Sequence, residues 1–323
     1  MHKSLFPIII ITLFLFTSCK ENKQTALLLQ SEQIITTVPS ASGIVCKGDN
    51  IWMIGDDASS IFELDEQNKI LSSYQISFMN RMGNGRINKT IKPDFESMDY
   101  FDGKIMVMGS GSSKITRDTA VLFSYKTKEI INKISLRPLF DKFLRLGKFD
   151  STQSINMEGL ASDDSHFYLL HRGNICGKNL VFQITKKDFL EYIGTGELPQ
   201  IKLHYFDLPK IDGFISGFSG ACISVDKNYL LYTSSVESTS DVYHDGEVLG
   251  SFIGMIPITG ANAWTMNTSF PLIKNDSILA TKLESICIKS HEDNILNLVC
   301  VSDNDNGESG IYHILLDMEF FNN

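Results

Sequence analysis

The feature of this sequence that most constrains its fold is a short motif that recurs five times. Each copy is a Glu or a Ser, followed by a small residue and then an apolar one. Its middle residues lie 54, 62, 61 and 65 positions apart (43 to 97, 97 to 159, 159 to 220 and 220 to 285). Self-similarity at a nearly constant period indicates a repeat architecture. The five copies are Ser42-Gly43-Ile44, Glu96-Ser97-Met98, Glu158-Gly159-Leu160, Ser219-Gly220-Ala221 and Glu284-Ser285-Ile286.

The same pattern follows each copy of the motif. In the first unit, a polar turn at residues 47–50 leads to the apolar run 51–54, a third apolar run at 61–64 and a weaker fourth at 69–76. Gly, Asn and Asp in such turns tolerate the dihedral angles of tight hairpins. Four antiparallel strands per unit, repeated radially, are typical of the blades of a β-propeller.

The two ends of the chain complement each other in this pattern. The last unit stops at Leu316 with three clear strands, whereas the run 33–38 near the N-terminus has no unit of its own. We expect this N-terminal strand to complete the fifth blade and close the ring, because closure removes exposed strand edges. The sequence therefore predicts an all-β fold, a β-propeller of five four-stranded blades in one domain over residues 31–323. Six blades would also fit if the long units contain further strands.

Two insertions interrupt the repeat. Residues 138–148 carry apolar residues at helical spacing and predict a short helix, which either caps the propeller or offers an interaction surface. Residues 237–247 are polar and predict a solvated loop.

The N-terminal segment is typical of a bacterial lipoprotein signal peptide. Lys3 supplies a positive charge, residues 5–16 form an apolar stretch, and Thr17-Ser18 precede Cys19. Cys19 is thus the predicted lipid attachment site, with residues 1–19 as the signal and 20–30 as a tether. A plain cleaved signal and a membrane anchor are the alternatives, but a membrane-spanning helix needs about 20 apolar residues. We expect a lipid-anchored protein of the cell envelope that faces the periplasm or the cell surface and touches the membrane only through its lipid.

The net charge of the chain narrows the classes of binding partner to expect. Lys and Arg number 29 against 38 Asp and Glu, which gives a net charge of −9, and the basic residues form no cluster. An acidic surface repels the phosphate backbone, so nucleic acid is not an expected partner. We expect a monomer that binds a small molecule, or an envelope protein or glycan.

Five cysteines remain after Cys19, and none forms a C-x-x-C pair or has zinc-like spacing with His. Most lie in apolar runs and are interpreted as small core residues. A cross-strand bridge between Cys287 and Cys300 is the alternative.

Several of these stretches resemble the SdiA-regulated, phytase-like group of bacterial envelope propellers. The stretches are Ser42-Gly43-Ile44, Phe95-Glu96-Ser97-Met98, Met157-Glu158-Gly159-Leu160-Ala161 and Val301-Ser302-Asp303-Asn304-Asp305. The resemblance implies a propeller fold. The phytase-like and esterase-like labels of some relatives would imply hydrolysis of phosphate or carboxylate esters, but no residues here clearly demand either reaction.

Propeller geometry predicts where a ligand would bind. The start of the first strand and the end of the second lie on one face of the ring, beside the central channel. Three glutamates at one channel mouth would repel each other unless a cation, a basic ligand group or Arg172 offset their charge, or one took up a proton. The predicted ligand-binding residues are Ser42, Asp56, Asp57, Glu96, Glu158, Arg172, Ser219, Glu284 and Asp303. For each motif residue, a hydrogen bond to the backbone of a neighbouring blade is the structural alternative.

The chemistry at this mouth is left open between two classes. The favoured one is a binding protein without catalysis, and the alternative is a metal-assisted hydrolase of phosphate or carboxylate esters. Asp303 and Asp305 lie in an oxygen-rich segment that would suit Ca²⁺, although its spacing does not match an EF-hand and an ordinary turn would have the same composition. No catalytic residues are assigned.

Overall fold

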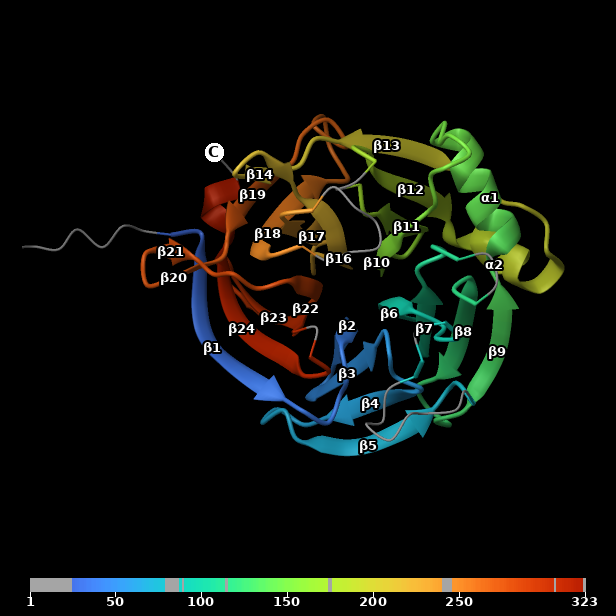
Figure 1. Ribbon diagram of the computed structural model, residues 1–323, viewed down its shortest axis with the longest axis horizontal. Coiled ribbons are helices and arrows are strands. Elements are labelled where there is room, and N and C mark those ends of the chain that lie inside the picture. The colour runs from blue at the N-terminus through green and yellow to red at the C-terminus, as the bar shows by residue number, and fades with distance from the viewer. Residues whose placement is uncertain are drawn as a thin grey trace, which may run out of the picture.

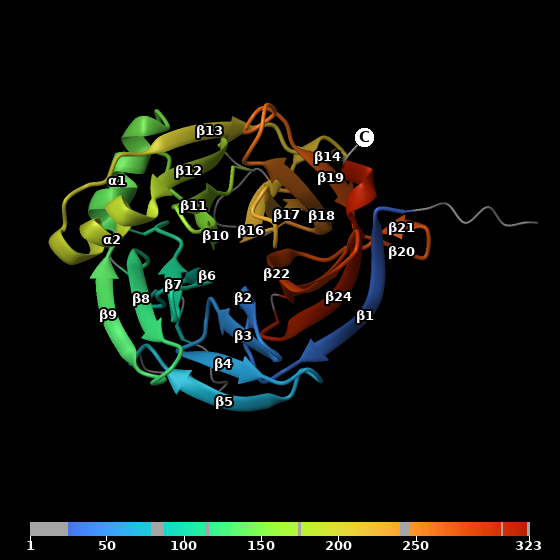
Figure 2. The ribbon, with the colours of Figure 1, turned by 180° about the vertical axis from the view of Figure 1, so that it is seen from behind.

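Five four-stranded antiparallel sheets surround a central axis in the computed structural model of this chain (Figures 1 and 2). The structure describes residues 25–78, 87–88, 90–113, 116–173, 176–239, 246–304 and 306–321. The prediction of an all-β propeller with five blades is confirmed.

Each blade runs from an innermost strand at the axis to an outermost strand at the rim. Blade 1 contains β2 (Ala41–Lys47), β3 (Asn50–Gly55), β4 (Ser60–Leu64) and β5 (Ile70–Gln75). Blade 2 contains β6 (Phe95–Phe101), β7 (Lys104–Gly109), β8 (Thr119–Ser124) and β9 (Ile130–Ser135). Blade 3 contains β10 (Met157–Ser162), β11 (His166–His171), β12 (Asn179–Thr185) and β13 (Lys202–Phe206). Blade 4 contains β16 (Gly217–Ile223), β17 (Tyr229–Glu237), β18 (Val248–Pro257) and β19 (Thr268–Pro271). Blade 5 contains β22 (Leu283–Glu292), β23 (Ile295–Asp303), β24 (Ser309–Asp317) and β1 (Leu27–Ile35).

The N-terminal strand closes the ring, as predicted. β1 is the outermost strand of blade 5 and pairs antiparallel with β24 over the register Leu27↔Leu316 to Ile35↔Ser309. The strand spans Leu27–Ile35 and not 33–38, so residues 36–38 follow it, and residues 27–30, the last part of the segment expected to be a tether, are strand instead. The three leucines at 27–29 were the signal for this part of the strand, and Leu27 packs into the apolar cluster between blades 4 and 5.

The hydrophobic core is divided among the five interfaces between neighbouring blades. Each interface has its own apolar cluster, such as the one around Trp52 between blades 1 and 2 and the one around Phe182 between blades 2 and 3. The other three clusters join blades 3 and 4, 4 and 5, and 5 and 1. Each blade therefore needs both neighbours to bury its two faces, which is why the ring must close.

A disulfide joins the two blades that meet at the closure. Cys46 on β2 and Cys287 on β22 are bonded, with their Cα atoms 5.7 Å apart. The predicted alternative, a bridge from Cys287 to Cys300, is wrong. Cys287 packs in the cluster between blades 5 and 1, whereas Cys300 packs in the cluster between blades 4 and 5, so the two side chains leave opposite faces of the sheet.

Within the described residues, two α-helices, two short hairpins and one 3-10 helix lie outside the blades. Helix α1 (Arg137–Leu146) buries Leu139, Phe140 and Phe143, and the Phe143 ring stacks on Phe182 at 4.0 Å. It therefore covers the interface of blades 2 and 3, in agreement with the capping role. Helix α2 (Lys186–Thr195), which the sequence analysis did not expect, lies beside it (Figure 1). The hairpins are β14 (Lys210–Ile211) with β15 (Phe214–Ile215) and β20 (Ile273–Lys274) with β21 (Ser277–Ile278), and the 3-10 helix η1 (Met318–Phe321) follows β24.

None of the helices in the described residues is both long and apolar enough to cross a membrane.

Candidate functional site at the channel mouth

The first residue of every motif is the extra residue of a β-bulge. In each blade the register between the first two strands shifts across this position, for example between Phe95 and Ser97 in blade 2. A bulge leaves one residue without a cross-strand partner and redirects its side chain. The five bulged residues are Ser42, Glu96, Glu158, Ser219 and Glu284.

At two copies of the motif, the neighbouring blade comes so close that the second residue must be small. A Cβ atom on Gly220 would lie 2.5 Å from the Ser285 Cα, and one on Gly43 would lie 2.9 Å from the Met98 Cβ. The innermost strands of adjacent blades approach so closely at this level that a larger side chain would push them apart. The motif thus combines a redirected side chain with close contact between blades.

The two serine copies bond to the next blade. The Ser42 hydroxyl donates to the backbone carbonyl of Phe95 at 2.5 Å, and the Ser219 hydroxyl donates to the carbonyl of Leu283 at 2.5 Å. Each carbonyl belongs to the residue directly before a motif glutamate. For both serines the structure thus shows a hydrogen bond to the backbone of the neighbouring blade, which was the alternative to ligand binding. These bonds hold the neighbouring glutamate strands in place, and the serine hydroxyls themselves are buried.

Two of the three motif glutamates surround Arg172. Its Nη1 atom lies 4.0 Å from Glu158 Oε2 and 3.7 Å from Glu284 Oε2, and its Nη2 donates to Glu237 Oε2 at 2.7 Å. Lys282 Nζ lies 3.1 Å from Glu284 and 3.3 Å from Glu237. We call these five residues the Arg172 cluster. They come from β10, β17 and β22 and from the residues just after β11 and before β22.

A second group of charges lies at the ends of blades 1 and 2. Lys92 Nζ pairs with Asp56, lies 3.5 Å from Asp57 Oδ1 and 2.9 Å from Asp94 Oδ1. Arg117 Nη1 contacts the other oxygen of Asp94 at 2.9 Å. We call these five residues the Lys92 cluster.

Glu96 lies between the two clusters. Carboxylate oxygens of Asp56, Asp94 and Glu96 lie within 4.8 Å of one another, and the Glu158 charge also acts on Glu96. Within the described residues, no basic side chain is at ion-pair distance from Glu96. This carboxylate therefore faces mainly other carboxylates, which is the surrounding that a cation would stabilise.

Burial and mutual repulsion perturb these carboxyl groups. Burial raises the pKa of Glu96 well above its usual range, and the nearby Glu158 raises it further. Burial also raises the pKa of Asp56 to about 7 and that of Glu284 to about 7, although Lys92 and Lys282 respectively oppose the shift. The pKa of Glu158 is raised in the same way, against the effect of Arg172.

Two carboxyl groups behave in the opposite manner. Burial alone would raise the pKa of Glu237, but Arg172 and Lys282 outweigh it and hold that pKa below its usual range. Lys92 and Arg117 do the same for the pKa of Asp94. The strongly paired acids thus stay ionised, while Glu96, Asp56, Glu158 and Glu284 compensate for the excess of negative charge by holding protons more tightly.

Among the described residues, the mouth has more acids than bases. Its carboxyl groups are Asp56, Asp57, Asp94, Glu96, Glu158, Glu237 and Glu284, and its basic groups are Lys92, Arg117, Arg172 and Lys282. This arrangement can bind a metal cation or a ligand with an ammonium group, and it disfavours an anion.

Comparison with known proteins places the chain in a family. Residues 37–316, which include part or all of every blade, match the model described as "Family of unknown function (DUF6929)". The chain belongs to the DUF6929 family. The finer resemblance to the SdiA-regulated, phytase-like group stays a prediction. The comparison with curated proteins found no match.

Solved structures similar to this DUF6929 chain share little sequence with it. Hydrazine synthase of Kuenenia stuttgartiensis has a TM-score of 0.40 and 12% identity, and the match covers 82% of this chain but 57% of the other. The β-propeller domain of Cps50 (Swd1) of Myceliophteria thermophila has a TM-score of 0.40 and 8% identity over 87% of this chain and 99% of its own. Virginiamycin B lyase of Staphylococcus aureus has a TM-score of 0.38 and 11% identity over 89% and 99%.

The sequence analysis named some of the mouth residues of the DUF6929 chain and missed others. The structure brings Asp56, Asp57, Glu158, Arg172 and Glu284 into the two clusters and Glu96 between them. Asp303 is half-buried at the end of β23, and Asp305 and Cys19 lie outside the described residues, so the calcium loop and the lipid site are not tested.

The missed residues are Lys92, Asp94, Arg117, Glu237 and Lys282. Glu237 was expected in a solvated loop, but β17 continues to this residue and buries it against Arg172. One signal could have found two of the others. Asp94 and Lys282 each stand two positions before a motif glutamate, directly before the innermost strand begins, so charged residues at this offset from the motif mark the same end of the blade.

Proposed function

We propose that this DUF6929 propeller is a binding protein of the bacterial cell envelope that takes a metal cation or a small cationic ligand at the channel mouth. The observation that carries the proposal is Glu96, a redirected bulge residue that faces Asp56, Asp94 and Glu158, while no basic side chain among the described residues is at ion-pair distance and Lys92 acts on it only from farther away. A bound cation would relieve this repulsion and displace the protons that the carboxyl groups hold.

The oxygen-only character of the Asp56, Asp94 and Glu96 group indicates a hard cation. Ca²⁺ takes six to eight oxygen ligands, and Mg²⁺ is commonly held by one or two carboxylates with water. Asp56, Asp57 and Asp94 already surround the ammonium group of Lys92, so carboxylates in this arrangement suit an ammonium group. A ligand that carries an alkylammonium group is therefore the organic alternative to a metal cation.

Isothermal titration calorimetry tests the proposal with CaCl₂, MgCl₂, ZnCl₂ and cadaverine as probes. We expect at least one probe to bind, and Glu96→Gln to weaken it by about tenfold or more, since the substitution removes a charge from the site. Glu292→Gln is the matched control, because this glutamate is exposed at the far end of β22. Absence of binding by all four probes, or equal binding by Glu96→Gln, would contradict the proposal.

The same preparation separates binding from the hydrolase alternative. A binding protein should leave p-nitrophenyl phosphate and p-nitrophenyl acetate intact in the presence of whichever cation binds. Turnover that disappears in Glu96→Gln but persists in Glu292→Gln would favour the metal-assisted hydrolase instead.

We also propose an envelope location, with a monomer anchored to the membrane only through lipid on Cys19. The lipobox-like sequence and the Cys46–Cys287 disulfide support it, because disulfides persist in oxidising compartments. Labelled palmitate should enter the wild-type protein and not Cys19→Ser. Equal labelling of both proteins would refute the anchor.

A further inference from the structure

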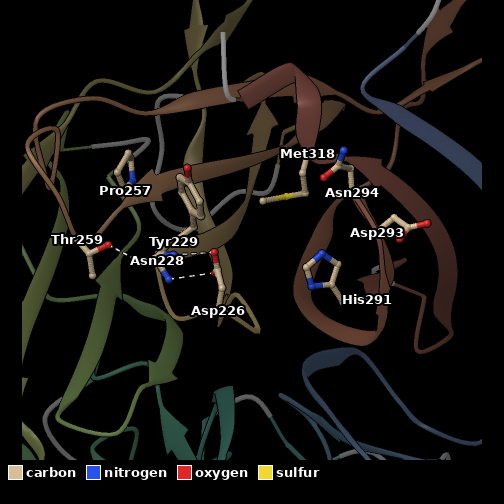
Figure 3. Close-up of a pocket in the computed structure, with 9 residues that line it drawn as sticks. All are labelled: Asp226, Asn228, Tyr229, Pro257, Thr259, His291, Asp293, Asn294 and Met318. Atoms are coloured by element: carbon tan, nitrogen blue, oxygen red, sulfur yellow. Dashed lines mark hydrogen bonds between the residues drawn. The ribbon is translucent and has the colours of Figure 1, made fainter.

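A cavity lies on the face opposite the channel mouth. It has a volume of about 430 Å³ and is bounded by blades 4 and 5 (Figure 3). The motif glutamates begin the innermost strands, whereas this cavity lies at the turns where those strands end, so the two sites are separated by the length of a strand. Its lining residues are Asp226, Asn228, Tyr229, Pro257, Thr259, His291, Asp293, Asn294 and Met318.

One wall of the cavity is a connected set of hydrogen bonds. Thr259 Oγ1 donates to Asn228 Oδ1 at 2.7 Å, and Asn228 Nδ2 donates to Asp226 Oδ2 at 2.8 Å. Ser224 Oγ donates to the other oxygen of Asp226 at 2.5 Å. The Asn228 amide is thereby fixed at both ends, and its second N–H remains available to a ligand.

The opposite wall is formed by an unusually long hairpin. Strand β22 has 10 residues, against 7 in β2, β6 and β16 and 6 in β10, and it contains a second bulge between Ile288 and Ser290. The extension carries His291, Asp293 and Asn294 to the side of the cavity across from Asp226 and Asn228 (Figure 3).

This second wall is also held in place. The Asn294 side chain donates to Glu319 Oε1 at 3.0 Å, and its backbone carbonyl accepts from the Met318 amide at 2.8 Å. Asn228 and Asn294 are therefore held in place before any ligand arrives, which lowers the conformational entropy that binding costs.

The chemistry of the lining selects a class of ligand. Hydrogen bonds from Ser224 and from Asn228 hold the pKa of Asp226 below its usual range against the effect of burial, so this carboxylate stays ionised. Asp226 and Asp293 repel anions, whereas carboxylate, amide and imidazole groups exchange hydrogen bonds with hydroxyl groups. Tyr229 and Met318 add apolar surface for the carbon skeleton of a ring.

We infer that this cavity binds a neutral polyhydroxylated ligand of one or two sugar rings. The volume of about 430 Å³ lies at the lower end of the range for small-molecule sites, which is about 300–1,000 Å³. The inference does not depend on the cation site, since the two sites share no residue.

Saturation-transfer NMR followed by calorimetry tests the inference with maltose, cellobiose, lactose, N,N′-diacetylchitobiose and, as an anionic comparison, glucuronic acid. We expect at least one neutral sugar to bind and glucuronic acid to bind more weakly. Asn228→Ala and His291→Ala should each lower the affinity by about tenfold, because each removes a hydrogen-bonding group from one wall. Asn262→Ala, an exposed asparagine in the loop after β18, and Glu96→Gln at the channel mouth should leave it unchanged.

Three outcomes would overturn the inference: no sugar in the panel binds, glucuronic acid binds best, or sugar binding is unaffected by both wall substitutions. Loss of sugar binding in Glu96→Gln would instead place the sugar at the channel mouth.

Discussion

Removing the Cys46–Cys287 disulfide should lower the stability of the propeller substantially. The bridge joins residues 241 positions apart and therefore restricts most of the unfolded chain. The loop-entropy relation gives about 5 kcal/mol for a loop of this length. At an unfolding entropy of about 2.1 cal/mol/K per residue, this free energy corresponds to a fall of roughly 8 °C in the melting temperature.

Differential scanning calorimetry with and without a phosphine reductant measures the effect. Wild-type protein should melt lower when reduced, and the Cys46→Ala/Cys287→Ala double variant should melt at the reduced wild-type temperature whether or not reductant is present. Cys176→Ala is the control, since this cysteine is not part of the bridge, and it should keep the full response to reductant. A double variant that still responds to reductant, or a wild type that does not, would refute the reasoning.

Four further predictions follow from particular contacts. Deleting residues 25–35 removes β1 and exposes the edge of β24, so the variant should lose its single cooperative melting transition or associate into larger species on size-exclusion chromatography. A monomer with unchanged melting would contradict the closure role of β1. Arg172→Met leaves buried carboxylates without their cation and should lower the free energy of unfolding in urea by about 3–5 kcal/mol, and adding Glu237→Gln should recover part of this loss. A double variant whose loss is the sum of the two single losses would argue against the pairing. The pKa of Glu284 is about 7 against an ordinary 4.5, so the folded state holds a proton that the unfolded chain releases, and the stability that this group contributes falls as the pH rises from about 4.5 to 7. Wild-type stability should therefore decline more steeply between pH 5 and 8 than that of Glu284→Gln, and equal slopes would be the contrary result. Gly220→Ala places a Cβ 2.5 Å from the Ser285 Cα and should lower the free energy of unfolding by about 1–3 kcal/mol, whereas Gly194→Ala in α2, where a Cβ meets nothing within 4 Å, should leave it unchanged or raise it by up to about 1 kcal/mol. Equal effects at the two glycines would contradict the close-approach argument.

The repeat and its consequences were readable from the sequence. Hairpin turns and apolar strands are local patterns, so each blade could be recognised from a few tens of residues, and the unmatched N-terminal run predicted the closing strand. The motif glutamates could be assigned to one channel mouth for the same reason, because strand direction alternates regularly within each blade.

Local patterns were insufficient where a side chain's role depends on which neighbour it meets. Helix α2 is weakly amphipathic in sequence, yet it is ordered by packing Phe189 and Tyr192 against blade 3. The serine and glutamate copies of the motif are also indistinguishable by spacing. The hydroxyl of Ser42 reaches a backbone carbonyl of the next blade, whereas the longer side chain of Glu96 extends to other carboxylates.

The sequence by itself indicated a propeller of five blades, with six left open, an N-terminal strand that closes the ring, and the position of the glutamates within each blade. Only the tertiary structure decided that Arg172 pairs with Glu237 and Glu284, and that Cys46 rather than Cys300 bonds to Cys287. The physical reason is that these partners lie on different blades, up to 241 residues apart along the chain. Closure of the ring brings them together, and the face of the sheet from which each side chain leaves determines what it meets.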